Sequence, residues 1–579
     1  IEPKKDDSKS ISIFCSVCQQ TVYPYHLFNH KKTHKALTFL GFDSPQMKTN
    51  KKTLLAQRQK LISELTKIPK YSETQRQKID YSFEFLTDMN CTPLYCDLAN
   101  INSPSTFRKV NNSLIKALSV CQDKNSTWQG DMEDRFIVLN NYGNRSDTCF
   151  LGLVDGSHGV TAAETVAAEL PLLFLDQLAQ MDSSYKKSKD EQQILDSFAT
   201  VIKSDYREKE KIFSDKPGND KTNTTNTYEW IHKAYAKSFW RMDRLLRLGR
   251  NEVSKVRWSG CSAVTCLVER IPSRETDGTE EEESKHSENT QSSSATTAKG
   301  AAGLLHIANI GNAHAVLCKN GKSHCLSKEH STSNISERKR ILQNGGNIST
   351  NEPDGLVEGH LRTTRGLGHH GDPVLKRSVI PVPHTISVPI DDTCQFLILA
   401  SNGLWEVLDY NEVLALTLTT FTLYLRMYEH VQQNGTSPYK CQYSMPLTEG
   451  NLNDSKAIHD LQDGIETLYS NKDIFLIDSK GNLKREKDTD TFCATGSKLL
   501  KTASSPSSKP PPQFEEDTNP YPPNCESQTA GRVTPETQQL LYDNAANYIS
   551  EQLVKTALAA GSRDNITVLI VLLNGCDKI

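Results

Sequence analysis

The apolar stretch within residues 394–408 runs into an Asn-Gly pair, and a turn of this kind at the end of a strand is a good place to hold a metal ion. Residues 396–400 have the pattern of a buried strand, and Asn402 and Gly403 then turn the chain toward a helix. A carboxylate at such a turn would emerge from the strand end and give a divalent metal a hard, anionic oxygen. Asn402 offers only a neutral dipole, so the sequence predicts that metal chemistry is weakened here.

A second group of potential metal ligands lies near the start of the chain, in the pattern Cys15-x2-Cys18-x11-His30-x3-His34. A short Cys knuckle followed by two histidines one helical turn apart has the spacing of a tetrahedral zinc site. The 11-residue spacer is slightly short of the usual form, and His26 is an alternative ligand. We predict a zinc finger of the two-cysteine, two-histidine kind. Chance clustering in a disordered segment is the other interpretation.

Seven other segments carry short motifs in a fixed order along the chain. They are residues 128–134, 154–159, 259–263, 308–316, 337–346, 359–369 and 561–568. Together with the turn at Asn402, they resemble the ordered motifs of the metal-dependent protein phosphatases of type 2C. Any one motif would say little, but the ordered set over about residues 118–575 is specific.

The resemblance implies a role for several acidic residues. In this family two divalent metals, Mn or Mg, hold a hydroxide that attacks phosphorus. By resemblance, Asp155 would bridge the two metals and the Gly156 carbonyl would help to hold the first one. Glu133 and Asp134 would orient the waters of that metal. Asp564 would hold the second metal together with Asp155 and the residue at the Asn-Gly turn.

Five positions depart from the family pattern. Asn402 replaces a metal-binding Asp, Gln129 replaces the Arg that clamps the phosphate, and Ser157 replaces the His that acts as general acid. Asn312 and His369 replace acids of an outer, weaker metal position. General acid–base help and electrostatic stabilisation each contribute about 10²–10⁴-fold, so their joint loss should leave little activity. We expect at most one Mg or Mn ion to bind, weakly. A structural role of the retained acids in turns is the alternative.

Composition narrows the class of protein. The 579 residues exceed one ordinary domain, and 67 basic against 70 acidic residues give a net charge of −3. This balance disfavours nucleic acid as the main partner. An odd number of cysteines, 15, predicts reduced thiols inside the cell, in the cytoplasm or nucleus. We expect no membrane span and no secretory peptide. A first residue other than Met is typical of a truncated form.

Apolar runs with strand character alternate with amphipathic helical segments. The predicted strands are residues 149–154, 263–268, 304–308, 313–317, 396–400 and 566–572, and the predicted helices are 52–65, 164–179, 231–246, 335–344, 412–427 and 537–560. We expect 304–308 and 313–317 to form a hairpin, because a Gly/Asn turn joins them. Neighbouring strand pairs of this kind favour antiparallel sheets over a parallel wound sheet.

Three regions follow along the chain. Residues 11–36 are a zinc-finger-like module, 37–117 a linker with one helical segment, and 118–575 the phosphatase-like domain. Residues 273–300 are rich in Glu, Ser and Thr, and 430–535 are polar and partly Pro-rich, so we predict two disordered insertions.

The sequence therefore predicts an α+β fold, in which a four-layer α/β/β/α sandwich of two antiparallel sheets flanked by helices follows a small N-terminal zinc finger. The leading functional hypothesis is a pseudophosphatase that binds protein partners, including phosphoproteins, with little or no phosphate-ester hydrolysis. One alternative is a weakly active Mn/Mg-dependent protein serine/threonine phosphatase. The other is a zinc-finger nucleic-acid-binding module, which the near-neutral charge disfavours.

Overall fold

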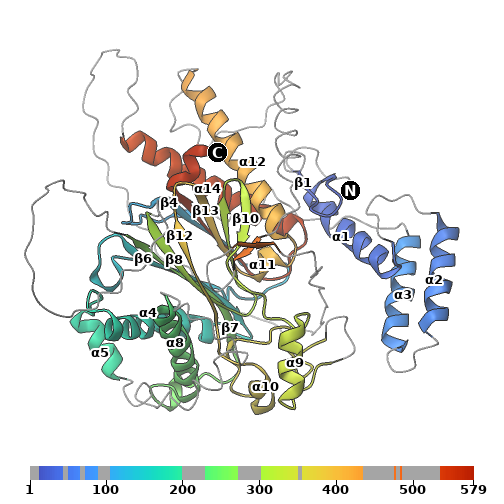
Figure 1. The fold of residues 1–579 in the computed structure, drawn as a ribbon, viewed down its shortest axis with the longest axis horizontal. Helices are drawn as coiled ribbons and strands as arrows, with labels where there is room; N and C mark the ends of the chain where they lie inside the picture. The colour runs from blue at the N-terminus through green and yellow to red at the C-terminus, as the bar shows by residue number, and fades with distance from the viewer. Residues whose placement is uncertain are drawn as a thin grey trace, which may run out of the picture.

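Two sheets lie at the centre of the molecule and helices lie on both sides of them (Figure 1). The computed structural model describes residues 12–42, 50–65, 72–88, 105–197, 228–271, 302–349, 355–433, 475–477, 483–485 and 535–579. The predicted insertion at 273–300 lies outside these residues, as does most of 430–535. None of the helices in these ranges is long and apolar enough to span a bilayer.

The larger sheet has eight strands in the order β15-β14-β10-β9-β13-β16-β4-β3, and the smaller one has the order β12-β8-β7-β6-β5, with β11 paired to β7. Neighbouring strands are antiparallel except β10 and β14. The bounds are β3 Thr106–Phe107, β4 Ile115–Asp123, β5 Arg135–Asn140, β6 Thr148–Ser157, β7 Gly260–Arg270, β8 Gly303–Ile310, β9 His314–Lys319, β10 Lys322–Cys325, β11 Leu367–Gly368, β12 His384–Ile390, β13 Cys394–Ala400, β14 Phe475–Ile477, β15 Leu483–Arg485 and β16 Ile566–Leu573.

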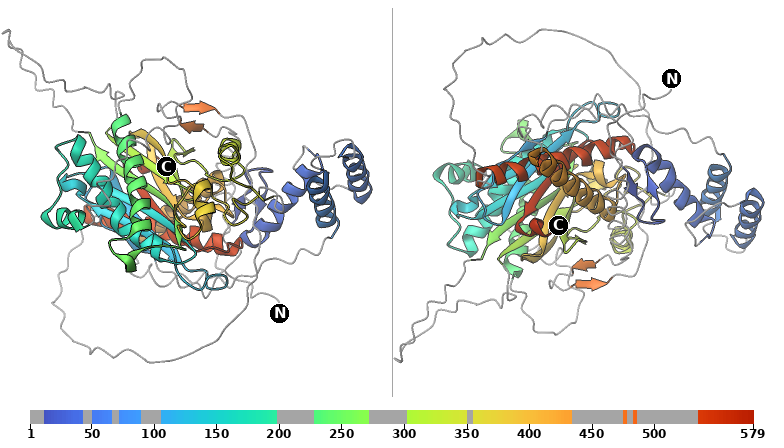
Figure 2. Two further views of the ribbon diagram at one scale, coloured as in Figure 1. Left: turned by 90° about the horizontal axis from the view of Figure 1, so that it is seen from below. Right: turned by 90° about the horizontal axis from the view of Figure 1, so that it is seen from above.

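Helices cover the outer face of each sheet. The bounds in the sandwich are α4 Thr161–Met181, α5 Lys189–Ser197, α8 Glu229–Leu248, α9 Ile335–Gln343, α10 Pro373–Ser378, α11 Asn402–Trp405, α12 Tyr410–Gln433 and α14 Pro535–Ala559. One apolar cluster joins α4 and α8 to the smaller sheet, a second fills the space between the sheets, and a third joins α12 and α14 to the larger sheet (Figures 1 and 2). The predicted four-layer α/β/β/α fold is confirmed.

The hairpin predicted for 304–308 and 313–317 is wrong. The corresponding strands β8 and β9 belong to different sheets, because β8 pairs with β7 and β12 whereas β9 pairs with β10 and β13. The turn at Gly311, with φ 79°, carries the chain from one sheet to the other. Both strands are almost wholly buried, which suits strands covered on both faces better than a half-exposed hairpin.

The N-terminal Cys/His segment packs onto the sandwich. It contains β1 Ile13–Phe14, β2 Thr21–Val22 and α1 Pro24–Phe39, and α1 begins at a proline, which suits the first turn of a helix. Ile13 and Leu27 are buried in the same apolar cluster as α12 and α14. Lys31 Nζ forms an ion pair with the fully buried Glu412 of α12 and donates to the Val407 carbonyl at 2.9 Å.

Two further helices follow this segment, α2 Lys51–Leu65 and α3 Ser72–Thr87. They pack on each other, and α3 also packs on α1. A small apolar cluster, which includes Leu40, Leu54 and Ile79, holds the three helices together. The pair α2–α3 projects from the end of the sandwich that carries α1 (Figure 2).

Candidate functional site

Acidic and amide side chains reach one end of the sandwich from both sheets. Asp155 lies on β6, Asn402 begins α11 directly after β13, and Asp564 comes just before β16. β13 and β16 are neighbours in the larger sheet, and β6 contacts β13 from the smaller sheet. The packing of the two sheets therefore brings together residues that are far apart in the sequence.

Asn402 makes the two contacts that define this centre. Its backbone N–H donates to Asp155 Oδ2 at 2.7 Å. Its side-chain Nδ2 donates to Asp564 Oδ2 at 3.1 Å. Gly403 permits this close packing, since a Cβ there would lie 2.2 Å from the Asn565 carbonyl oxygen. The residue that replaces the expected Asp thus holds both neighbouring carboxylates through N–H groups.

The acids of this centre crowd one another in a buried place. Burial raises the pKa of Asp155 well above its ordinary value, and the charges of Asp134 and Asp564 raise it further. Burial also raises the pKa of Asp134 to about 7. The pKa of Asp564 is raised by burial as well, although the hydrogen bond from Asn402 works against it. Bound protons or a cation relieve repulsion among carboxyls at such short range.

Glu133 and Asp134 are fixed beside β6 by hydrogen bonds. The Glu133 N–H donates to Asn565 Oδ1 at 2.8 Å, and Glu133 Oε1 accepts from the Gly159 N–H at 2.9 Å. Asp134 Oδ2 accepts from Thr567 Oγ1 at 2.8 Å. Gly156 is required at the contact with this segment, because a Cβ there would lie 2.5 Å from the Glu133 carbonyl oxygen.

The residues in place of the phosphate clamp and the general acid make local contacts. Gln129 Nε2 donates to the Arg563 carbonyl at 2.8 Å. Ser157 Oγ lies 3.3 Å from the Gly260 carbonyl and 3.4 Å from His369 Nε2. A neutral amide bound to the backbone offers no charge to a phosphate. A serine hydroxyl is too weak an acid to replace an imidazolium.

The two residues expected at the outer metal position, Asn312 and His369, make contacts within the protein. Asn312 Oδ1 accepts from Ser262 Oγ at 2.7 Å, so this amide is bound within the protein. His369 is 7% exposed, and burial lowers its pKa to about 4. A neutral imidazole and an amide do not form the oxygen-rich site that Mg or Mn prefers.

One buried acid of the centre did not emerge from sequence reasoning. Glu406 Oε1 accepts from the Arg563 N–H at 2.6 Å and from Ser562 Oγ at 2.9 Å. Burial raises its pKa, and the charge of Asp564 raises it further. The available signal was its position in the sequence. Glu406 follows α11 directly, four residues after Asn402, so one helical turn places the two residues on the same side.

This centre does not fit the pair of divalent metals that the resemblance implies. The Asn402 N–H groups face the carboxylate oxygens of Asp155 and Asp564 that a second metal would need. Across the described ranges, only the Cys/His cluster brings three or more ligand atoms within 4.8 Å of one another. The N–H donors of Asn402 therefore occupy carboxylate oxygens of Asp155 and Asp564 that the second of two metals would need.

Cys15, Cys18, His30 and His34 do form a compact group, with all four ligand atoms within 4.8 Å of one another. Cys18 Sγ lies 3.2 Å from His30 Nε2, and Cys15 Sγ lies 3.5 Å from His34 Nε2. The two Nε2 atoms are 3.0 Å apart. The His26 ring lies tilted against the Tyr25 ring, with centroids 4.3 Å apart, and is not part of this group.

The electrostatics of this group suit zinc. Burial lowers the pKa of His30 to about 4, and burial also lowers the pKa of His34, so both rings are neutral and free to donate a lone pair. Burial raises the pKa of Cys15 to about 12. A soft dication bound by sulfur would offset that penalty by stabilising the thiolate. Two sulfur and two imidazole ligands at this spacing fit a tetrahedral zinc ion.

The four-layer sandwich, with acids gathered at one end of both sheets, is the arrangement expected from the resemblance to the metal-dependent phosphatases. A sequence profile described as Protein phosphatase 2C matches residues 221–424. The chain is 44% identical over 573 residues to the human "Protein phosphatase 2C-like domain-containing protein 1", covering 97% of this chain and 89% of that protein. The mouse protein of the same name is 38% identical over 575 residues, covering 97% and 88%. The chain therefore belongs to the protein phosphatase 2C family.

Solved structures resemble the chain more distantly. A "serine-threonine phosphatase 2C from Toxoplasma gondii" is 17% identical, with a TM-score of 0.33, and the match covers 58% of this chain and 90% of that one. A TM-score at this level carries no weight for fold or function.

Proposed function

We propose that this protein is a pseudophosphatase that binds protein partners, including phosphoproteins, with little or no hydrolysis of phosphate esters. The observation that carries this proposal is the pair of hydrogen bonds from Asn402, one to Asp155 and one to Asp564. The side-chain amide satisfies Asp564 without a metal, and the backbone N–H of the same residue satisfies Asp155. An aspartate there would leave three carboxylates together, which only a cation or protons could stabilise.

The other substitutions support the same proposal. Gln129 cannot clamp a phosphate by charge, and Ser157 cannot protonate a leaving group as an imidazolium would. Positions 129, 402 and 157 act on different parts of the reaction. These parts are, in the same order, substrate binding, formation of the metal hydroxide and departure of the alcohol. Their effects within one site are not strictly additive, but together they remove most of the catalytic advantage of the family.

Phosphatase assays on the purified chain test this proposal. We expect no turnover of a phosphopeptide above the Asp155→Ala background, even with excess Mn, and calorimetry should detect at most one divalent ion, in the millimolar range. The double variant Asn402→Asp/Gln129→Arg should gain activity, whereas Asn344→Asp, an exposed change on another turn, should not. Turnover near that of an intact family member, lost on Asp155→Ala, would support the weakly active phosphatase instead. So would two tight Mn sites.

We also propose that the Cys/His group binds one zinc ion with a structural role. The four ligand atoms converge, and both imidazoles are neutral at physiological pH. The basic side chains of the finger helix are used within the protein, since Lys31 pairs with Glu412 and Lys32 lies over the Tyr81 and Phe85 rings. This use of the charges disfavours the nucleic-acid-binding alternative.

Metal analysis of the full chain tests the zinc proposal. We expect one zinc per chain, and cobalt substitution should give the visible spectrum of a tetrahedral site with thiolate ligands. His30→Asn should lose the metal, whereas His26→Asn, four residues earlier on the same helix, should keep it. Loss of zinc from His26→Asn with retention by His30→Asn would assign the ligand set differently.

We further propose an intracellular location, in the cytoplasm or nucleus. Within the described ranges ten cysteines are present, none is joined in a disulfide, and most are buried. Such thiols persist in a reducing compartment. Microscopy of the tagged full chain would test the location.

A further inference from the structure

The outer side of β5 is an open sheet edge. β5 pairs with β6 at one side of the smaller sheet, in register from Arg135 opposite Val154 to Asn140 opposite Cys149. In the described part of the chain, no strand pairs with its other side. An edge strand presents every second pair of backbone N–H and C=O groups outward, ready to pair with a further strand.

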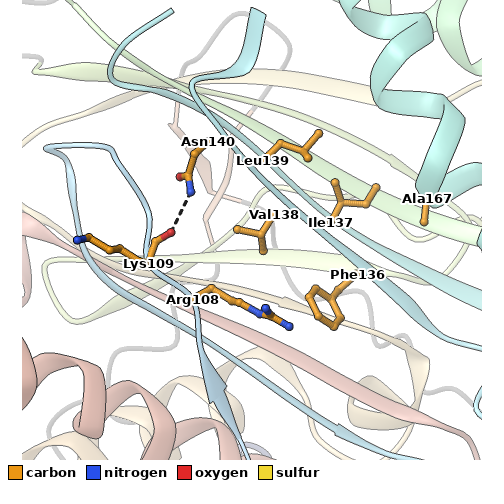
Figure 3. Close-up of a pocket in the computed structure, with 8 residues that line it drawn as sticks. All are labelled: Arg108, Lys109, Phe136, Ile137, Val138, Leu139, Asn140 and Ala167. Carbon is orange, nitrogen blue, oxygen red and sulfur yellow. Dashed lines mark hydrogen bonds between the residues drawn. The ribbon is translucent and has the colours of Figure 1, made fainter. Parts of the chain in front are cut away.

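A groove of about 530 Å³ follows this edge (Figure 3). Its lining residues come from β5, from the segment after β3 and from α4, and they are Arg108, Lys109, Phe136, Ile137, Val138, Leu139, Asn140 and Ala167. Ile137 belongs to the apolar cluster under α4, whereas Phe136 and Val138 pack against the cluster between the sheets. Successive side chains of β5 thus offer apolar surface on both faces of the edge.

The wall of the groove opposite β5 is basic. The Arg108 guanidinium lies 5.4 Å from the centre of the Phe136 ring, and both Arg108 and Lys109 are exposed. Asn140 Nδ2 donates to the Lys109 carbonyl at 2.9 Å, and Asn140 Oδ1 accepts from the Asn111 N–H at 2.9 Å. These two hydrogen bonds hold the basic segment against the end of β5, as Figure 3 shows for Lys109 and Asn140.

We propose that this groove binds an extended, acidic segment of a partner protein, which adds to β5 as a further strand. The backbone of the segment pairs with the open edge, its alternate apolar side chains pack beside Phe136 and Val138, and its carboxylates face Arg108 and Lys109. Charge complementarity selects an acidic partner. The inference rests on the proposed function only in that the protein acts by binding proteins. It names a site and a partner chemistry away from the Asn402 centre.

Fluorescence anisotropy with the full chain tests the site. The probe is a labelled peptide of sequence Glu-Glu-Val-Thr-Val-Thr-Val, compared with the same peptide carrying Lys-Lys in place of Glu-Glu. We expect the acidic peptide to bind at least about tenfold more tightly than the basic one, with an affinity that falls as salt rises. N-methylation of alternate backbone nitrogens in the peptide should abolish binding, because it removes the donors that pair with β5.

Matched variants locate the binding. Lys109→Glu should weaken the acidic peptide about tenfold, whereas Lys339→Glu, an exposed charge reversal on α9, should leave its affinity unchanged. No binding of the acidic peptide, equal binding of the N-methylated one, or equal losses in both variants would overturn the proposal. Deletion of residues 273–300 gives a further test. If the acidic peptide then bound at least about tenfold more tightly, the proposal would also be overturned, because the chain's own acidic run Glu280–Glu283 would be the occupant of the groove. The probe carries no phosphate, so the result is independent of any phosphatase activity.

Discussion

A single atom separates the residue at position 402 from the family's aspartate. Asn and Asp have the same shape, but Asn carries an NH₂ group where Asp carries an oxygen. In this protein the NH₂ group donates to Asp564, and the backbone N–H of the same residue donates to Asp155. The change therefore does more than remove a metal ligand. It supplies a hydrogen bond that stabilises the remaining carboxylates when no metal is bound.

Asn402→Asp should make the stability of the fold depend on divalent metal. Loss of the amide donor removes one hydrogen bond from Asp564 and places a third carboxylate beside Asp564 and Asp155, so in EDTA we expect destabilisation by about 1–3 kcal/mol. Added Mn should restore much of that loss in the variant and change the wild type little. Thermal unfolding with EDTA or Mn measures both effects, with the exposed Asn344→Asp as control. A variant as stable as the wild type in EDTA would show that the hydrogen bond contributes nothing.

The buried ion pair between Arg365 and Glu337 gives the protein a defined acid sensitivity. Arg365 Nη2 lies 2.6 Å from Glu337 Oε1, and both side chains are almost fully buried. Burial alone would raise the pKa of Glu337, but the hydrogen bond and charge of Arg365 outweigh it and lower this pKa from 4.5 to about 2. A depressed carboxyl pKa stabilises the fold above pH 4.5, and this contribution is lost as the pH falls from 4.5 toward 2.

Glu337→Gln should therefore destabilise the protein strongly at neutral pH and much less near pH 2. Removal of the Glu337 charge leaves the buried Arg365 guanidinium without this counter-charge, which costs about 3–5 kcal/mol. Glu164→Gln breaks the exposed pair with Arg135 and should cost less than about 1 kcal/mol. Urea unfolding at pH 7 and pH 2 gives the comparison. Equal losses for the two variants at pH 7 would contradict the assigned role of burial.

At the scale of elements, the strongest periodic segments were predicted correctly. The helix predicted at 52–65 is α2, and the long segment predicted at 537–560 is α14. Strands with polar or short sequences, such as β3 and β10, carried too little apolar signal to be found, whereas β5 was missed although it contains the apolar run Phe136–Leu139. The error at β8 and β9 has a different cause. A Gly/Asn turn fixes the reversal of the chain, but only tertiary packing decides whether the second strand joins the same sheet.

The Cys/His segment was predicted as a separate module, and its packing could not be foreseen. Its four ligand residues follow a local spacing, which a sequence displays directly. Its contacts with α12 involve residues almost 400 positions away, such as Lys31 with Glu412. Asp155 and Asn402 could likewise be singled out from the sequence. The hydrogen bond between them could not be predicted, because it joins residues that are far apart along the chain. Local chemistry was predictable, whereas contacts created by folding were not.

Leu27→Ala should destabilise the whole sandwich and not only the finger. Leu27 is fully buried in the cluster shared with α12 and α14. A cavity at such a site costs about 2–5 kcal/mol. Unfolding in urea, followed by circular dichroism and by tryptophan fluorescence, should remain a single transition at a lower midpoint. Leu55→Ala, on an exposed part of α2, should change little. A separate early transition would mean that the finger unfolds independently.

At the scale of the whole molecule, the sheets are complete without the long connection between β7 and β8. Arg270 and Gly303 are paired, and the Ile271 N–H donates to the Ala302 carbonyl at 3.0 Å. An Asn-Gly turn could close this hairpin directly. Replacement of residues 272–301 by Asn-Gly should leave the melting temperature within a few degrees of the wild type. A collapse of stability would show that this segment contributes to the core.

The packing of α1 fixes where a self-sufficient fragment of this protein must begin. A cut at residue 105, just before β3, would keep the sheets but strip Ile13, Val22 and Leu27 from the apolar cluster and leave Glu412 without Lys31. Such a fragment would expose an apolar surface and the unpaired Glu412 carboxylate to water, and it would be prone to aggregate. Failed expression of the shortened protein would then reflect the loss of the side chains of the Cys/His segment from the apolar core. It would not show that the phosphatase-like fold itself is unstable.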